Sequence, residues 1–263
     1  MCGIAGFIGF SNNRELAEMA NRLQQHRGPD NQSVWSDEHV AFAHQRLSII
    51  DLSEAANQPF HKGDLLIIFN GEIYNYKELQ EKMQAEKGVK FITSSDTEVV
   101  LEMYSNYGVA CLQDLIGMFA FAIYNKVTNS LFLARDHFGI KPVFYVQLAG
   151  GLAFSSELKT LAQIPGFDKT INAKSLVSSL NYLWVSGNET MFKGCNKLPA
   201  AHYLTYSKEG DMHMARYWEL EEPKLNSITN NEEAVKEELA KVLELSVKRH
   251  MVADVPVSSF LSG

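Results

Sequence analysis

Short apolar runs alternate with amphipathic stretches along this chain. The runs are bounded by glycine, proline, asparagine and serine, and several are apolar at every position, which is typical of strands covered on both faces. Gly150 and Gly151 separate two of them and predict the turn of a hairpin. The predicted strands cover residues 3–7, 40–43, 47–50, 65–69, 118–124, 130–134, 143–148 and 152–154.

The amphipathic stretches carry apolar residues three or four positions apart, so they predict helices that pack one face against a core. Ser95 and Glu98 have the spacing of a capping box at the start of one of them. The predicted helices cover residues 14–25, 77–87, 96–107 and 232–251. Many antiparallel strands interleaved with such helices indicate an α+β layered fold.

The same pattern divides the chain into three parts. Residues 1–207 carry most of the predicted strands and form a first domain. Residues 208–230 are polar and show no periodic spacing of apolar residues, which predicts a linker. Residues 231–263 contain a helix and then a strand-like run over 255–261, so they predict the truncated beginning of a second domain.

Composition narrows the classes of function. The 263 residues carry 24 Lys and Arg against 31 Asp and Glu, a net charge of −7, so a surface for nucleic acid or for an anionic membrane is not expected. The three cysteines are too few and too scattered for a disulfide framework or a metal cluster. The longest nearly apolar run, residues 115–124, is shorter than the ~20 residues that cross a bilayer. We therefore expect a cytoplasmic protein without a metal site.

Cys2 is the first candidate for chemistry. Removal of Met1 would place a thiol and a free α-amino group on one residue, and such an amine titrates near ~7.7–8.0, close enough to neutrality to act as a base. Two other readings fit the same apolar opening, a buried structural cysteine and the core of a secretory signal. The first ten residues alone leave this choice open.

Further motifs follow the opening in a fixed order, and together they are more specific than any one of them. They are MCGI at residues 1–4, HRGPD at 26–30, RLSIID at 46–51, NGEIYN at 70–75, SDTE at 95–98, GMFAFA at 117–122, RDHFGIKP at 135–142 and SSELK at 155–159. Over essentially the whole chain, these residues resemble the class II glutamine amidotransferases, specifically the asparagine synthetase B type.

The resemblance implies a fold and a reaction. The fold is a four-layer αββα N-terminal-nucleophile hydrolase, with two stacked antiparallel sheets between helices, followed by the first helix and strand of a truncated α/β ATP-pyrophosphatase domain. The reaction is hydrolysis of glutamine, in which Cys2 attacks the side-chain amide. Its oxygen then carries negative charge, and the family pattern assigns the stabilising donors to the Asn70 side chain and the Gly71 N–H. By itself, Asn-Gly is also a common hairpin turn.

The resemblance also assigns the residues that bind glutamine. Arg46 is expected to bind the α-carboxylate, since a guanidinium meets a carboxylate with two parallel hydrogen bonds, although a surface ion pair would explain it too. Asp96 is expected to bind the α-ammonium, with Glu72 in the same or a supporting role. An acidic residue in a first helical turn is favourable without any ligand. The remaining residues either line the pocket or form plain strand core, and they are Leu47, Ser48, Ile49 and Ile50.

The end of the chain resembles the start of the family's pyrophosphate loop, where a strand opens through glycines onto a helix that holds ATP phosphates. The residues of this partial ATP site are Leu261, Ser262 and Gly263. Without the rest of that domain, we expect the chain to lack ATP activation of an acceptor carboxylate.

The expected function is the glutaminase half of a glutamine-hydrolysing asparagine synthetase. The glutaminase needs no cofactor, whereas the complete protein would use ATP and Mg²⁺ to activate aspartate, and the resemblance also allows a homodimer. Two alternatives stay open at this point. Relatives in surface-polysaccharide pathways amidate sugar carboxylates such as uronic acids, and residues 181–185 faintly resemble them. A non-catalytic domain of the same fold could instead serve as a regulatory or interaction module.

Overall fold

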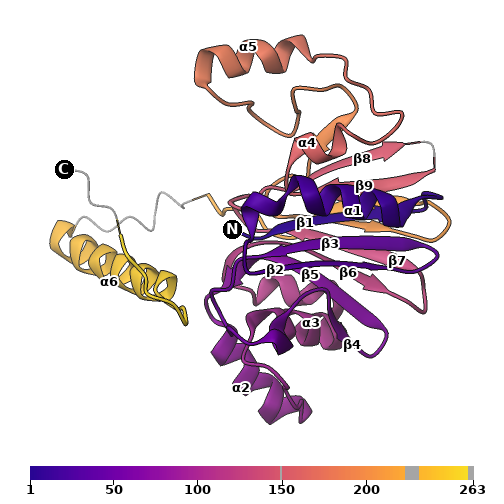
Figure 1. Cartoon of the computed structure of the whole chain (residues 1–263). Helices are drawn as coiled ribbons and strands as arrows, with labels where there is room; N and C mark the ends of the chain where they lie inside the picture. Colours follow the sequence, from indigo (N-terminus) through magenta and orange to yellow (C-terminus); the bar gives the residue numbers. More distant parts are fainter. Residues whose placement is uncertain (149, 223–230, 260–263) are drawn as a thin grey trace.

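The computed structural model describes residues 1–148, 150–222 and 231–259. Within these residues, two six-stranded sheets stack face to face and helices cover their outer faces (Figure 1). The strand order is β10-β8-β9-β1-β3-β2 in the first sheet and β12-β11-β7-β6-β5-β4 in the second. Neighbouring strands are antiparallel throughout.

The elements have the following bounds. The first sheet consists of β1 (Gly3–Ile8), β2 (Asn31–Ser36), β3 (Val40–Arg46), β8 (Phe144–Leu148), β9 (Gly151–Ser155) and β10 (Cys195–Lys197). The second sheet consists of β4 (Phe60–Lys62), β5 (Leu65–Ile73), β6 (Gly117–Asn125), β7 (Ser130–Arg135), β11 (His202–Tyr206) and β12 (Met212–Arg216). The α-helices are α1 (Asn13–Leu23), α2 (Tyr76–Lys87), α3 (Asp96–Tyr107), α4 (Leu158–Leu161), α5 (Ala173–Tyr182) and α6 (Glu232–His250).

Three packed cores hold the layers together. The central core lies between the sheets and includes the fully buried rings of Phe42, Tyr124 and Phe154. A second core joins α2 and α3 to the outer face of the second sheet, and a third joins α1 and α4 to the outer face of the first. The predicted αββα arrangement is therefore confirmed, and burial of apolar area in these cores is its main source of stability.

Most predicted elements form, including both hairpins, which pair as β6 with β7 and as β8 with β9. The capping box is only half formed. The Ser95 hydroxyl accepts from the Thr97 N–H at 3.1 Å, but the Glu98 carboxylate accepts from the N–H groups of Ile92 and Thr93 instead of returning to Ser95.

The predicted strand over residues 47–50 is wrong. β3 ends at Arg46, and the next residues form a loop. Side chains from distant segments bind the backbone of this loop: Ser48 N–H donates to Asp30 Oδ2 at 2.7 Å, and Leu47 N–H donates to Cys2 Sγ at 3.4 Å. A strand partner is not needed, because these contacts satisfy the polar groups that a ladder would otherwise bind.

The C-terminal part of the chain also differs from the expectation. Residues 212–216, inside the predicted linker, form β12 and pair with β11. The predicted helix forms as α6, but its apolar residues are exposed, with Leu239 at 56%. Residues 255–259 form no strand. The predicted partial ATP site, Leu261, Ser262 and Gly263, lies outside the described residues.

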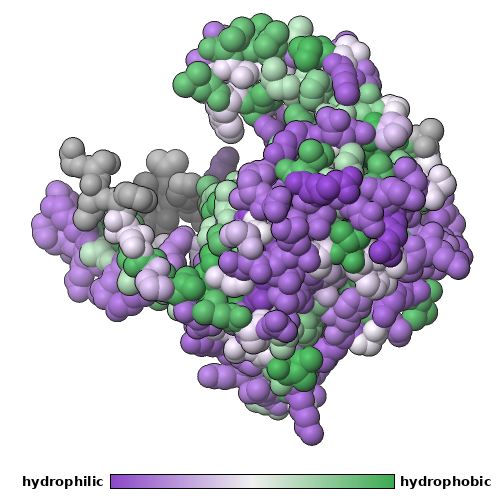
Figure 2. Space-filling view, viewed as in Figure 1, coloured by the Kyte–Doolittle hydropathy of each residue, from purple (hydrophilic) through white to green (hydrophobic). Residues whose placement is uncertain are grey.

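Figure 2 shows hydrophobic side chains gathered over α5 on the surface of the molecule, where Val177 and Leu180 are exposed. In the part of the chain that the structure describes, no helix is both long enough and apolar enough to cross a membrane.

Candidate active site

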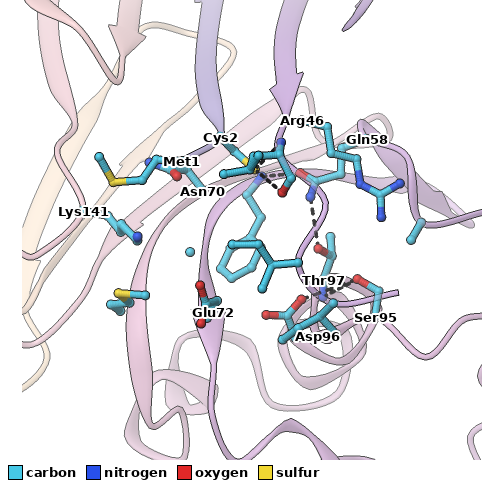
Figure 3. A pocket seen from close by; sticks show the side chains of 17 residues that line it. Met1, Cys2, Arg46, Gln58, Asn70, Glu72, Ser95, Asp96, Thr97 and Lys141 are labelled. Atoms are coloured by element: carbon cyan, nitrogen blue, oxygen red, sulfur yellow. Dashed lines mark hydrogen bonds between the residues drawn. The ribbon is translucent and has the colours of Figure 1, made fainter. Parts of the chain in front are cut away.

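A cavity of about 220 Å³ lies where the start of β1, the end of β3, the second half of β5 and the start of α3 meet (Figure 3). The predicted site residues that line it are Cys2, Arg46, Leu47, Ile49, Ile50, Asn70, Gly71, Glu72 and Asp96. The lining residues that were not predicted are Met1, Ala56, Gln58, Phe69, Ser95, Thr97, Met118 and Lys141. Ser48 is not among the lining residues.

Contacts from three segments fix the position of Cys2. Its Sγ lies between the N–H and the carbonyl oxygen of Leu47, at 3.4 and 3.6 Å. Arg27 Nε donates to the Cys2 carbonyl at 2.9 Å, while Arg27 Nη1 donates to Glu157 at 3.1 Å. The motifs at residues 26–30 and 155–159 therefore meet behind the thiol and hold its backbone.

Burial controls the ionisation of the groups at the chain terminus. It raises the pKa of the Cys2 thiol, which favours the neutral thiol. It also lowers the pKa of the Met1 amine, with further lowering by the positive charges of Arg27 and Lys141. While Met1 is attached, the nitrogen of Cys2 is an amide and has no basic lone pair. Removal of Met1 stays a prediction. The Cys2 amine that it would expose would lie in the same partly buried environment near Arg27 and Lys141, which lowers the pKa of an amine.

Asn70 supplies a donor with no partner. Asn70 is 1% exposed, and its side-chain Nδ2 makes no hydrogen bond to any described residue. A buried polar group left unpaired costs about 1–3 kcal/mol, so such a group in a cavity indicates a ligand that completes it. Figure 3 shows Asn70 close to Cys2 at the wall of the cavity.

Gly71 presents a second donor, and the register of the sheet reveals it. In an antiparallel ladder, the backbone groups of successive residues point to opposite edges. Phe119 lies opposite Gly71 on β6, and its carbonyl oxygen accepts from the Asp136 N–H on the far side. Phe119 and Gly71 therefore form a pair without mutual hydrogen bonds, and the Gly71 N–H points away from β6.

Side chains cap the neighbouring positions on that outer edge of β5, beyond the end of β4. Phe69 N–H donates to Gln58 Oε1 at 2.6 Å, and Ile73 N–H donates to Asp96 Oδ2 at 3.0 Å. Gly71 lies between them, and no side chain of the described residues caps its N–H. A side chain at this position would also clash, because a Cβ would lie 2.2 Å from the Met118 carbonyl oxygen.

Arg46 is only partly free for a ligand. Its Nη1 donates to Ser53 O at 2.8 Å and to Asn57 Oδ1 at 2.7 Å, and its Nη2 donates to Asp51 O. A guanidinium has five N–H donors, so two remain after these three bonds, enough for one bidentate contact.

The carboxylates of Asp96 and Glu72 line the cavity, and neither forms an ion pair with a described residue within 4.0 Å. Asp96, at the start of α3, is 4% exposed, and burial raises its pKa to about 7, aided by the negative charge of Glu72 and opposed by the Ile73 N–H. Burial likewise raises the pKa of Glu72, while Lys141 and His250 oppose this shift. A bound ammonium group would lower both pKa values and favour the charged carboxylates.

Gln58 and Lys141 are two of the polar lining residues that the sequence analysis did not assign to the site. Gln58 bridges the layers, because its Oε1 accepts from Phe69 N–H and its Nε2 donates to Thr97 Oγ1 at 3.1 Å. No sequence signal marks it. Lys141 lies inside the motif at residues 135–142, which did signal importance but not a role. It is 6% exposed, and burial lowers its pKa against the attraction of Glu72 and Cys2.

Comparisons with known proteins identify the family to which the chain is similar. Residues 1–218 match the profile of a family described as "Glutamine amidotransferase domain". The chain is 36% identical, over its whole length, to asparagine synthetase [glutamine-hydrolyzing] 3 of Bacillus subtilis, and covers 43% of that protein. It is 38% identical over 99% of its length to asparagine synthetase [glutamine-hydrolyzing] 1 of the same organism, and covers 42% of it. The chain thus spans less than half the length of these relatives.

A solved structure supports the fold. The glutamine phosphoribosylpyrophosphate amidotransferase of B. subtilis aligns with a TM-score of 0.61 over 83% of this chain and 50% of that protein, at 19% identity. At this identity the likeness concerns the fold alone.

Proposed function

Because the chain belongs to the glutamine amidotransferase family, whose members use glutamine as an amide donor, we propose that the cavity beside Cys2 is its glutaminase site. One observation carries the proposal. A buried side-chain donor without a partner, Asn70 Nδ2, and an uncapped backbone donor, Gly71 N–H, line the same cavity as a thiol. Two fixed donors near a nucleophile are what attack on an amide carbonyl requires.

The proposed reaction starts once Met1 has been removed. The α-amine of Cys2 takes the thiol proton, and Sγ forms a bond to the side-chain amide carbon of glutamine. The resulting oxyanion accepts from Asn70 Nδ2 and Gly71 N–H. The protonated amine then gives its proton to the amide nitrogen, the C–N bond breaks, and ammonia leaves a glutamyl thioester. Water adds to the thioester, the C–S bond breaks, and glutamate is released.

The remaining lining residues would bind the amino acid portion of glutamine. Arg46 has two free donors for the α-carboxylate, and the carboxylates of Asp96 and Glu72 would receive the α-ammonium. The loop with Leu47, Ile49 and Ile50 forms the wall. Ser48 contributes only as part of that loop, since its N–H is already bound to Asp30.

We further propose asparagine as the product of the complete protein. The relatives with 36–38% identity are named asparagine synthetases, and they extend well beyond the length of this chain. In that longer protein, ammonia would pass to a second domain that activates aspartate with ATP and Mg²⁺. A cytoplasmic location, where scattered thiols stay reduced, and a homodimer belong to the same proposal.

A comparison of glutamate release by the wild-type chain, Cys2→Ala and Asn70→Ala tests the proposed site. We expect no turnover from Cys2→Ala. In Asn70→Ala, kcat/KM should fall about 10²–10³-fold with little change in KM, because that donor acts on the oxyanion. Asn106→Ala, which changes an exposed asparagine on α3, is the matched control and should behave like wild type.

Two results would overturn the mechanism. One is equal glutamate release from wild type and Cys2→Ala. The other is active protein whose intact mass still includes Met1. Labelling of Cys2 by a glutamine-analogue electrophile, followed by mass spectrometry, gives an independent measure of whether glutamine chemistry takes place there.

A further inference from the structure

The end of α6 and the residues after it contact the two-sheet fold through three residues, His250, Val252 and Asp254. The His250 ring lies 4.4 Å from the Tyr74 ring, centroid to centroid, and Val252 packs against the core beneath the second sheet. Asp254 makes two hydrogen bonds: its N–H donates to Ile49 O at 2.9 Å, and its Oδ2 accepts from the Asp51 N–H at 2.7 Å.

Of these three residues, Asp254 is the one that hydrogen-bonds to the loop that forms the cavity wall. Ile49 and Ile50 line the cavity, and the two hydrogen bonds of Asp254 are made to the Ile49 carbonyl and the Asp51 N–H, at either end of this pair. Asp51 is a non-glycine residue with φ of 53°, a left-handed conformation that surrounding contacts must maintain.

Asp51 connects this contact to two proposed glutamine-binding residues. Its carbonyl oxygen accepts from Arg46 Nη2. Its Oδ2 accepts from the Ser94 N–H at 2.9 Å, two residues before Asp96 at the start of α3. A displacement of Asp51 would therefore move both the guanidinium and the carboxylate that face the cavity.

We propose that Asp254 is a positioning residue for the glutamine site, which it holds in its binding geometry through Asp51 and Ile49. The proposal rests on the proposed glutaminase function and deepens it. It makes glutamine binding depend on a segment more than 200 residues away, in the part of the chain that the sequence predicts as the start of a second domain. Docking of that segment would then adjust affinity for glutamine, and by reciprocity glutamine would stabilise the docked segment.

The first test compares Asp254→Ala with Asp254→Asn in the full chain. Loss of the carboxylate should raise KM for glutamine about fivefold and leave kcat within about twofold, because the loop binds substrate and does not carry the reacting atoms. Asp254→Asn keeps an acceptor oxygen and should stay within about twofold of wild type. Val257→Ala, an exposed position on the same segment, is the control. An unchanged KM in Asp254→Ala, or equal defects in both Asp254 variants, would refute the proposal.

A second measurement does not depend on turnover. Amide hydrogen exchange at residues 47–51 should become faster in Asp254→Ala and stay unchanged in Val257→Ala, with both variants showing wild-type far-ultraviolet circular dichroism. Unchanged exchange in Asp254→Ala would overturn the positioning role even in a chain without glutaminase activity. Absence of glutamate release from wild type, by contrast, would contradict the proposed function and leave the exchange result to decide on Asp254.

Discussion

Two residues that line the cavity carry buried polar groups that a bound ligand would pair. Asn70 Nδ2 is buried and has no hydrogen-bond partner among the described residues, and burial raises the pKa of Asp96 to about 7. Each arrangement costs folding free energy, because a buried polar or charged group loses its water. Such costs persist in a stable fold when they serve binding or catalysis. Asn70 and Asp96 line one cavity, as the proposed oxyanion donor and ammonium-binding carboxylate would require.

The pKa of Asp96 gives a pH prediction. In the proposed site, glutamine would bind through its α-ammonium to the ionised Asp96 carboxylate, so below about pH 7 the proton of Asp96 would first have to leave. We expect KM for glutamine to rise about tenfold per pH unit below pH 7. The measurement is KM from pH 5.5 to 8.5. In Asp96→Asn, KM should be higher at pH 8 and nearly independent of pH, so an equally steep rise in this variant would contradict the assignment.

The contribution of Asp96 itself to folding stability depends on pH in the opposite sense. Asp96 binds its proton more tightly in the folded state than in the unfolded chain, since its pKa is raised from 3.8. The folded state therefore holds more protons between about pH 4 and 7, and this residue makes the fold more stable as the pH falls. As the pH falls, glutamine binding should weaken while the contribution of Asp96 to stability increases.

At the scale of elements, the unequal lengths of β4 and β5 create the backbone part of the site. β5 has nine residues, whereas β4 has three and pairs only with residues 65–67. The rest of that edge would offer unpaired N–H groups, which natural sheets usually cover. Gln58 and Asp96 cap two of them, and the one between them, Gly71, remains for a ligand.

Gly71→Ala tests this arrangement. The new Cβ would lie 2.2 Å from the Met118 carbonyl oxygen and 2.7 Å from the Phe119 Cα, and backbone of a paired strand cannot move aside easily. We expect a loss of about 3 kcal/mol in the free energy of unfolding, measured by urea denaturation, together with loss of glutaminase activity. Gly63→Ala in the β4–β5 turn meets no atom within 4 Å but has φ of 58°, so it should cost only about 1 kcal/mol. Equal costs for the two would argue against the predicted clash.

At the scale of the whole molecule, the site is assembled from both sheets. Cys2 and Arg46 lie at the ends of β1 and β3 in the first sheet, whereas Asn70 and Gly71 belong to β5 in the second. The spacing of the sheets therefore sets the position of the thiol relative to the donors. Aromatic rings set that spacing: Phe42 of the first sheet meets Tyr124 of the second with ring centroids 6.4 Å apart.

Phe42→Ala should weaken the whole sandwich. A cavity left between the sheets costs about 3–5 kcal/mol for a buried phenylalanine, measured by urea denaturation. Phe138→Ala, at a phenylalanine that is 69% exposed, should cost less than about 1 kcal/mol. If Phe42→Ala were as mild as Phe138→Ala, the packing between the sheets would not control stability as proposed.

The sequence alone determined what local pattern and ordered motifs can encode. Continuous apolar runs predicted the buried strands, helical spacing predicted α1, α2, α3 and α6, and the motif series placed Cys2, Arg46, Asn70 and Asp96 among the candidate residues. These predictions can be made from sequence because each depends on residues a few positions apart or within one motif.

Only the tertiary structure decided the rest. Residues 47–50 look like a strand by composition, but Cys2, Asp30 and Asp254 bind the backbone around them as a loop. The edge of β5 is free at Gly71 because β4 ends before that residue. The Asn70 amide nitrogen has no partner because no described side-chain or backbone oxygen accepts a hydrogen bond from it. Such groups are defined by contacts across tens to hundreds of residues, and a hydrogen bond that is left open has no sequence pattern of its own.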